Sequence, residues 1–274
     1  MGDEMKFLIL WLCMISSALA QSENLQWNRY ETQNFVILSL DNEQGNWLNS
    51  NLESLKSDCL NRWGFPDDKF TKECRIFCVP NKDLLKKLFK IDEPKVEIKK
   101  DISVVWTISQ DSKSISKSLM MVCLSELEEK QKIQIGFWFK KGASELNGQV
   151  HEIQNEISAL HKFISRDDLM FTSKKMFEIT ENEYLKLNEK EKKLFDIQAT
   201  TLCLMLRKEF GEAHLQGFLR FSGKNNPENV LKVIYNFQSY SHFDKQYIRY
   251  MKDLSSDIIK EKTPIAYLKV QSVN

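Results

Sequence analysis

The chain has 274 residues, 42% hydrophobic and 28% charged, and its 39 basic and 38 acidic side chains leave a formal net charge of +1. This composition is that of a globular protein and excludes disordered and fibrous classes. The near-zero net charge provides no general attraction for nucleic acid, so no nucleic-acid partner is expected. Only 9 glycines and 5 prolines are present, which argues against long linkers and against an all-β chain rich in turns.

The first 20 residues predict an export signal. Phe7–Ile15 is an unbroken apolar run, and Ala18-Leu19-Ala20 is a small-residue pattern that suits cleavage after Ala20. The run is about half of the ~20 residues that a membrane-spanning helix needs, so the mature chain is expected to have no transmembrane anchor. The sequence therefore predicts a secreted or periplasmic protein.

Five cysteines remain after removal of the signal. They are Cys59, Cys74, Cys78, Cys123 and Cys203. Export places them where disulfides persist, and their odd number leaves at least one thiol or an intermolecular bond. Cys74 and Cys78 on one strand would lie about 13 Å apart, too far to bridge. We expect Cys59 to pair with one of these two, with Cys74 favoured, and expect Cys123 and Cys203 to be core thiols in apolar helical runs.

Strands and helices alternate in the first half of the chain. Apolar periodicity and turn residues predict the following elements: a strand at Phe35–Leu40, a helix over 45–63, a strand at Cys74–Val79, a helix at Lys82–Phe89, one or two strands within Lys95–Ile108 and a helix at Ser116–Lys130.

Helices dominate the second half. The predicted ones are Phe137–Leu146, Val150–Ile164, Tyr184–Phe210, Ala213–Phe221, Glu228–Tyr235 and His242–Ile259. Gly211 is expected to end the long helix, and Ile265–Val270 is expected to be a closing strand. The predicted class is α+β, with one domain over 21–274. Its N-terminal part, about 33–150, holds a small mixed sheet with helices, and its part at about 151–262 is mainly helical.

The order of these elements resembles that of a known protein family. A helix is followed closely by Gly136-Phe137-Trp138-Phe139-Lys140-Lys141-Gly142-Ala143. Over about residues 33–255 this order resembles the peptidase MA-like domains, which are gluzincin-type zinc metallopeptidases. In that family an H-E-x-x-H helix precedes a segment resembling P-x-W-x-x-E-G-x-A, whose glutamate is the third zinc ligand. Trp138, Gly142 and Ala143 are the best anchors, and the resemblance implies a zincin-like fold.

The chain departs from the family at the zinc site. Lys141 stands where the glutamate ligand belongs, and the preceding helix has no histidine. Two registers of the lost motif are open, one on Lys117, Ser118 and Met121 with Lys141, the other on Ser125, Glu126 and Glu129 with Lys141. A lysine ammonium has donors only and cannot bind zinc, so we expect no metal, no cofactor and no catalytic residue at this site.

The ammonium groups of lysines in such a site need acidic side chains nearby to balance their charge. We expect the helix Ser116–Lys130 to pack beside Phe137–Ala143, with an acid among Glu126, Glu129 and Glu145 within ion-pair reach of Lys141. The preferred hypothesis is an exported, catalytically inactive gluzincin-like domain. It would bind or scaffold through the former substrate cleft, with an unidentified peptide or protein as ligand.

Two other hypotheses stay open. His151-Glu152-Ile153-Gln154-Asn155 begins like H-E-x-x-H but has Asn155 in place of the second histidine. An active metallopeptidase or hydrolase with rearranged ligands would then centre on His151, Glu152 and Glu126. The other hypothesis discards the resemblance and leaves a structural domain of the cell envelope.

Overall fold

The computed structural model describes residues 25–147 and 171–261, with the backbone alone over 255–261. The chain divides into two compact units, described separately below. The sheet unit contains the residues up to Glu53 together with Glu73–Asp111, and the helical unit contains Ser54–Lys72 and the chain from Ser112 onward. Outside the described residues lie the expected export signal, the helix Val150–Ile164 and the strand Ile265–Val270.

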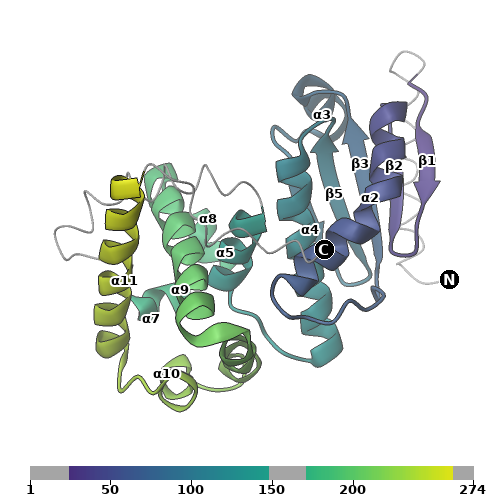
Figure 1. The fold of residues 1–274 in the computed structure, drawn as a ribbon. Coiled ribbons are helices and arrows are strands. Elements are labelled where there is room, and N and C mark those ends of the chain that lie inside the picture. Colours follow the sequence, from purple (N-terminus) through teal and green to yellow (C-terminus); the bar gives the residue numbers. More distant parts are fainter. Residues whose placement is uncertain (1–24, 148–170, 262–274) are drawn as a thin grey trace. The chain divides into compact units, whose positions relative to one another are not determined.

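The sheet unit is built on five strands (Figure 1). They are β1 (Asn28–Glu31), β2 (Phe35–Ser39), β3 (Glu73–Val79), β4 (Lys95–Ile98) and β5 (Ile102–Ile108). Their order is β1-β2-β3-β5-β4; β2, β3 and β5 run parallel, and β1 and β4 are antiparallel edges. The parallel centre explains the continuous apolar runs that predicted β2, β3 and β5, because central strands are covered on both faces.

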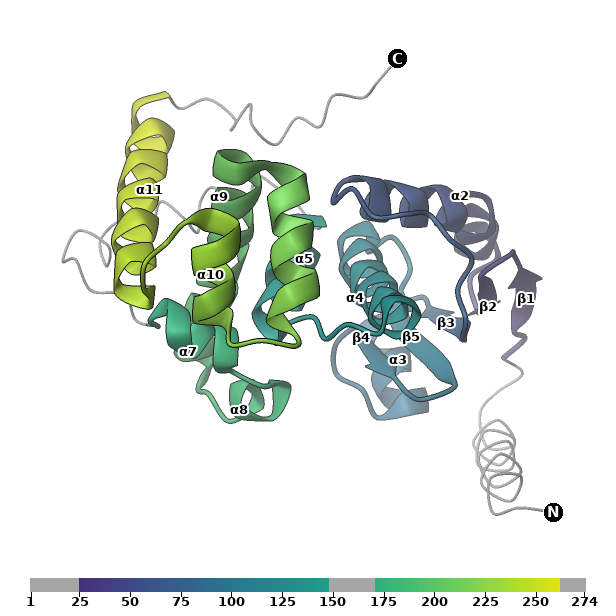
Figure 2. The same ribbon diagram turned by 90° about the horizontal axis from the view of Figure 1, so that it is seen from below.

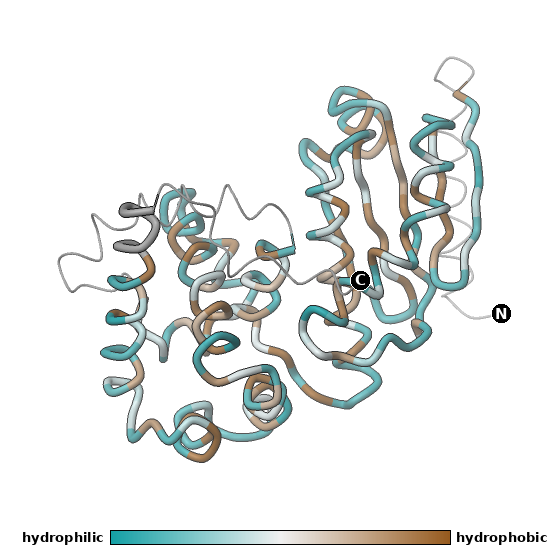
Figure 3. Tube along the Cα trace, viewed as in Figure 1, coloured by the Kyte–Doolittle hydropathy of each residue, from teal (hydrophilic) through white to brown (hydrophobic). Residues whose placement is uncertain are grey.

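Hydropathy follows the position of each strand in the sheet. Figure 3 shows the central strands β3 and β5 as mainly hydrophobic and the edge strand β1 as hydrophilic. The four residues of β1 alternate between partly buried and exposed. Such a short polar edge strand has almost no sequence signal, which is why β1 was not among the predicted elements.

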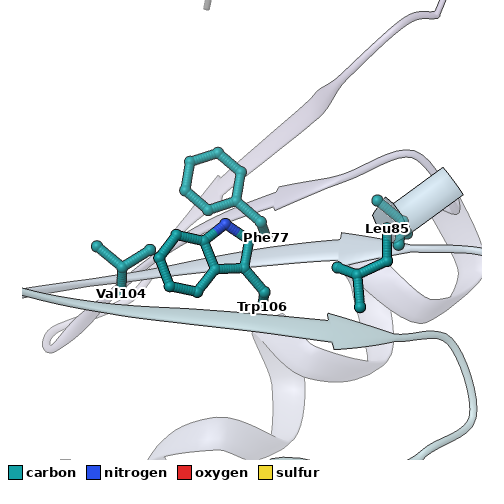
Figure 4. Packing of buried hydrophobic residues seen from close by; sticks show 5 residues of the cluster. Phe77, Leu85, Val104 and Trp106 are labelled. Carbon is teal, nitrogen blue, oxygen red and sulfur yellow. The ribbon is translucent and has the colours of Figure 1, made fainter. Parts of the chain in front are cut away.

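One face of the sheet packs against α3 (Lys82–Phe89). The buried side chains of this core are Phe77, Val79, Leu85, Val104 and Trp106. Phe77 and Trp106 occupy paired positions of β3 and β5, and their rings stack with centroids 6.4 Å apart, as the close-up in Figure 4 shows. The large rings fill the space between sheet and helix, and each such pair adds about 0.5–1.5 kcal/mol beyond its buried area.

The opposite face is covered by the first half of α2 (Asn42–Asn61), so that α2 and α3 lie on opposite sides of the sheet (Figure 2). Gly45 allows this helix to approach closely. A Cβ atom at Gly45 would clash with the ring of Tyr30 and would lie 3.1 Å from Cβ of Ser39. Glycine is therefore required here by the contact between α2 and the β1–β2 hairpin.

The helical unit is formed by the second half of α2 and a series of further helices. These are α4 (Ser112–Gln131), α5 (Phe137–Asn147), α7 (Ser173–Glu178), α8 (Glu181–Leu185), α9 (Glu189–Ser222), α10 (Pro227–Tyr235) and α11 (Tyr240–Glu261). Helix α5 packs against both α4 and α9. The predicted helices in the described part of this unit are present, and α7 and α8 are additional short ones.

The long helix begins later than expected, at Glu189 instead of Tyr184. Two capping boxes cause the difference. Thr180 pairs with Glu183 and starts α8, and Asn188 pairs with Glu191 and starts α9. Gly211 was expected to end the helix; it has φ 82° and ψ 168°, so the helical path breaks there and resumes to Ser222.

Gly142 sets the distance between α5 and α9. A Cβ atom at this position would clash with the backbone carbonyl of Ala199 and would lie 2.7 Å from Sγ of Cys203. The absent side chain thus lets the two helix backbones come into direct contact. This accounts physically for one of the three residues on which the sequence resemblance depends.

The α+β class is confirmed: a mixed five-stranded sheet precedes a predominantly helical region. The chain passes between the two units after Glu53, after Lys72 and after Asp111. Helices α4 and α5 belong with the helical unit because α5 packs on α9 and α4 packs on α5. Among the described helices, none combines the length and the apolar character that crossing a membrane requires.

Candidate functional site

Two ion pairs join α4 to α5. Lys117 forms one with Glu145, and Nζ of Lys140 lies 2.6 Å from Oε2 of Glu128 in the other. Since Lys117 precedes Glu128 while Glu145 follows Lys140, the two helices run antiparallel. The side chains of both pairs are about three-quarters buried or more, so these are not freely solvated surface charges.

A second site lies between α5 and α9 and is built around Lys141 of α5 and Asp196 of α9. Nζ of Lys141 lies 3.3 Å from Oδ2 of Asp196, and the two side chains are only 23% and 24% exposed. The hydroxyl of Tyr184, from α8, donates to the same Oδ2 at 3.0 Å. Lys141 Nζ also lies 5.1 Å from the centroid of the Tyr184 ring, within the range of a cation–π interaction.

Burial governs the electrostatics of this site. It raises the pKa of the Asp196 carboxyl to about 6, against the opposing effect of the Lys141 ammonium. Glu145, the partner of Lys117, adds a further rise through its like charge. The other carboxylate oxygen, Oδ1 of Asp196, is buried and accepts no hydrogen bond. Burial likewise raises the pKa of the Tyr184 hydroxyl, so it remains a donor at neutral pH.

The residues of the two candidate registers make different contacts in the structure. Lys117, of the first register, points to α5, and Ser118 is buried. Glu126, of the second register, accepts hydrogen bonds from the backbone N–H of Thr71 at 2.6 Å and from its hydroxyl at 2.7 Å, and a weaker one from the N–H of Lys72. Its carboxylate therefore holds the loop before β3.

The prediction of the acidic partner of Lys141 was wrong. We predicted Glu126, Glu129 or Glu145, and the structure pairs Lys141 with Asp196. Glu129 instead forms an ion pair with Lys72, and Glu145 lies one helical turn from Lys141 but pairs with Lys117. The predicted packing of the two segments is confirmed, because α4 and α5 are in contact.

The residues that the resemblance predicts at the zinc positions do not fit zinc. Lys117 and Lys141 offer positive donors, each neutralised by a carboxylate, and a bound cation would be repelled by both. Among the described residues, no group of three or more His, Cys, Asp or Glu side chains lies close enough together to hold a metal ion. His151, Glu152 and Asn155 lie outside the described residues.

The five cysteines of the predicted mature chain are all buried, and the described residues contain no disulfide. Burial raises the pKa of the Cys59 thiol to about 12 and raises that of Cys203 as well. The pairing of Cys59 with Cys74 or Cys78 stays a prediction for the exported protein. Mass spectrometry of unreduced, proteolysed protein would detect either linkage.

Sequence reasoning missed Asp196 and Tyr184. Asp196 stands inside an apolar helical stretch, between Phe195 and Ile197, both of which are buried. A lone carboxylate within such an apolar stretch needs a hydrogen-bond or ion-pair partner. This requirement was the feature of the sequence that could have pointed to Asp196. Tyr184 was assigned to the start of the long predicted helix, which concealed its position on the separate helix α8.

No family model matches the sequence, and no curated protein matches it.

Proposed function

We propose that the helical unit carries a metal-free, catalytically inactive gluzincin-like site, in which lysine ion pairs replace the zinc ligands. The exported protein then acts by binding or scaffolding a peptide or protein. In this proposal the fold is zincin-like, and the first register of the lost motif, on Lys117, Ser118 and Met121, is the correct one.

The single observation that carries the proposal is the pairing of Lys117 and Lys141 with acids that are about three-quarters buried. Lys117 pairs with Glu145 across α4 and α5, and Lys141 pairs with Asp196 across α5 and α9. Two ammonium groups in adjacent helices repel unless each is compensated, so these pairs stabilise an arrangement that a metal would otherwise organise. A metallopeptidase needs its ion as Lewis acid and as source of hydroxide, and lysines supply neither.

Metal analysis and a peptidase assay on residues 21–274 test the proposal. The expected result is no stoichiometric zinc after purification in zinc-supplemented buffer and no cleavage of an unfolded protein substrate. Proteolysis that a chelator abolishes, together with one zinc per chain, would overturn the inactive assignment.

Restoring the ligands tests the register. The fourfold variant Lys117→His, Ser118→Glu, Met121→His and Lys141→Glu should bind one zinc per chain, measured by competition with a chromophoric chelator. The matched control omits Lys141→Glu and should bind zinc at least ten-fold more weakly, because it lacks the third ligand. Equal zinc binding by the two variants would contradict the position assigned to Lys141.

A further inference from the structure

The sheet unit contains a cavity of about 500 Å³ at the carboxyl ends of β2 and β3. Leu40 follows the last residue of β2, Pro80 follows the last residue of β3, and Leu84 comes from the first turn of α3. The carboxyl ends of parallel strands are the usual location of ligand sites in open α/β sheets. The volume lies in the range of small-molecule sites, about 300–1,000 Å³.

The lining combines an apolar surface with side-chain amides. Leu40, Pro80 and Leu84 supply the apolar part, and Gln26, Asn28 and Asn42 supply the amides. The hydroxyl of Tyr30 donates to Oδ1 of Asn42 at 2.5 Å and so orients that amide. A side-chain amide carries both donors and an acceptor, which is the pattern that a peptide group complements.

Charge excludes an anionic ligand. None of the lining residues within the described part of the chain is ionisable. The two adjacent helix N-termini are already capped, since Oδ1 of Asp41 accepts from the N–H of Gln44 and Oδ1 of Asn81 accepts from the N–H of Leu84, both at 3.0 Å. The hydrogen bond to Gln44 lowers the pKa of Asp41, so a negative charge stands next to the cavity at neutral pH. Among the described residues, the lining also has no aromatic ring on which a sugar would stack.

We propose that this cavity binds an uncharged peptide segment, whose aliphatic side chain packs on Leu40, Pro80 and Leu84 and whose peptide groups bond to Asn28, Asn42 and Gln26. The site lies wholly in the sheet unit. It is therefore independent of the metal-free site proposed for the helical unit.

The test is an NMR titration of isotopically labelled residues 21–274 with N-acetyl-alanyl-leucinamide. Saturable shifts are expected at the backbone signals of Leu40 and Leu84 and at the side-chain amides of Asn28 and Asn42. N-acetyl-alanyl-leucine differs only by a terminal carboxylate and should bind at least five-fold more weakly. Absence of saturable shifts with the amide, or equal binding of the two compounds, would overturn the proposal.

A variant pair locates the site. Gln26→Leu combined with Asn28→Leu should weaken binding of N-acetyl-alanyl-leucinamide at least ten-fold. Asn49→Leu, an exposed position of α2 away from the lining, should leave it unchanged. Unaltered binding by the double variant would overturn the assignment. The comparison of the two compounds uses the unaltered protein and so decides the question even if the double variant does not fold.

Discussion

Lys141 of α5 and Asp196 of α9 form an ion pair next to a close contact between the backbones of the two helices. Gly142, the next residue of α5, contacts the carbonyl of Ala199, which lies less than one turn after Asp196. The close backbone contact and the half-buried ion pair therefore occupy the same short interface. Changes at these positions should affect packing and electrostatics in ways that experiments can separate.

Replacing Lys141 with methionine should destabilise the protein by about 1–3 kcal/mol. The substitution keeps the aliphatic stem but leaves the half-buried Asp196 carboxylate without its counter-charge, and partial exposure keeps the cost below that of a fully buried pair. Urea unfolding at pH 7 measures the change. The control is Lys174→Met at an exposed position of α7, which should alter stability by less than about 0.5 kcal/mol. Equal effects of the two substitutions would refute the prediction.

Asp196 should make stability depend on pH. Its pKa is about 6 in the folded protein, against the ordinary value of 3.8, so the folded state holds more protons between these pH values and stability falls as pH rises through them. The contribution is complete below pH 4 and lost above pH 6, and at about 1.4 kcal/mol for each pKa unit it amounts to at most about 3 kcal/mol. The unfolding free energy of the wild type, relative to Asp196→Asn, should therefore decrease between pH 4 and pH 7. A constant difference over this range would show that Asp196 titrates normally.

Gly142→Ala should destabilise the helical unit by about 3 kcal/mol or more. The added methyl group meets backbone at Ala199, which cannot rotate away, and overpacking of this kind costs about 1–3 kcal/mol even where side chains can shift. Gly217→Ala in α9 is the matched control, because its methyl group would lie 3.5 Å from Cδ1 of Ile234, an ordinary contact. That change should stabilise by about 0.5–1 kcal/mol through helix propensity. Thermal unfolding of both variants gives the comparison, and a neutral Gly142→Ala would contradict the described contact.

Glu126→Gln should lower the free energy of unfolding by about 1–3 kcal/mol. The buried carboxylate accepts from both the N–H and the hydroxyl of Thr71, and a neutral amide weakens these bonds and turns an NH₂ group toward donors. Glu129→Gln, on an exposed side chain three residues further along α4, removes only an ion pair to Lys72 and should cost less than about 1 kcal/mol. Denaturation in urea distinguishes them. A Glu126→Gln protein as stable as Glu129→Gln would show that Glu126 does not hold the loop.

Periodicity in the sequence predicted the elements that bury one continuous face. The strands β2, β3 and β5 and the helix α3 have large apolar contacts and clear turn residues, and the predicted bounds of α3 agree with the structure. The strand β1 and the helix α8 escaped prediction because neither has a buried apolar face long enough to set a period. The start of α9 was readable only from its capping residues, Asn188 and Glu191, and not from hydropathy.

The site was predictable in part. That Lys117 and Lys141 cannot serve as zinc ligands follows from residue chemistry alone, whichever elements carry them. The counter-charge could not be inferred in the same way, because Asp196 lies 55 residues after Lys141 and reaches it only through the packing of α5 on α9. The prediction named Glu126, Glu129 and Glu145, and the carboxylate of Glu126 in fact binds the loop at Thr71.

The break at Gly211 divides α9 into two helical segments. Its backbone adopts φ 82°, a conformation that other residues avoid, although a methyl group there would meet nothing within 4 Å. Backbone geometry alone therefore selects glycine at this point. Amides on the two sides of Gly211 should exchange with solvent deuterium at different rates, because opening one segment need not open the other. We therefore expect the end of α9 near α10 to open in the folded protein while the segment that carries Asp196 stays closed.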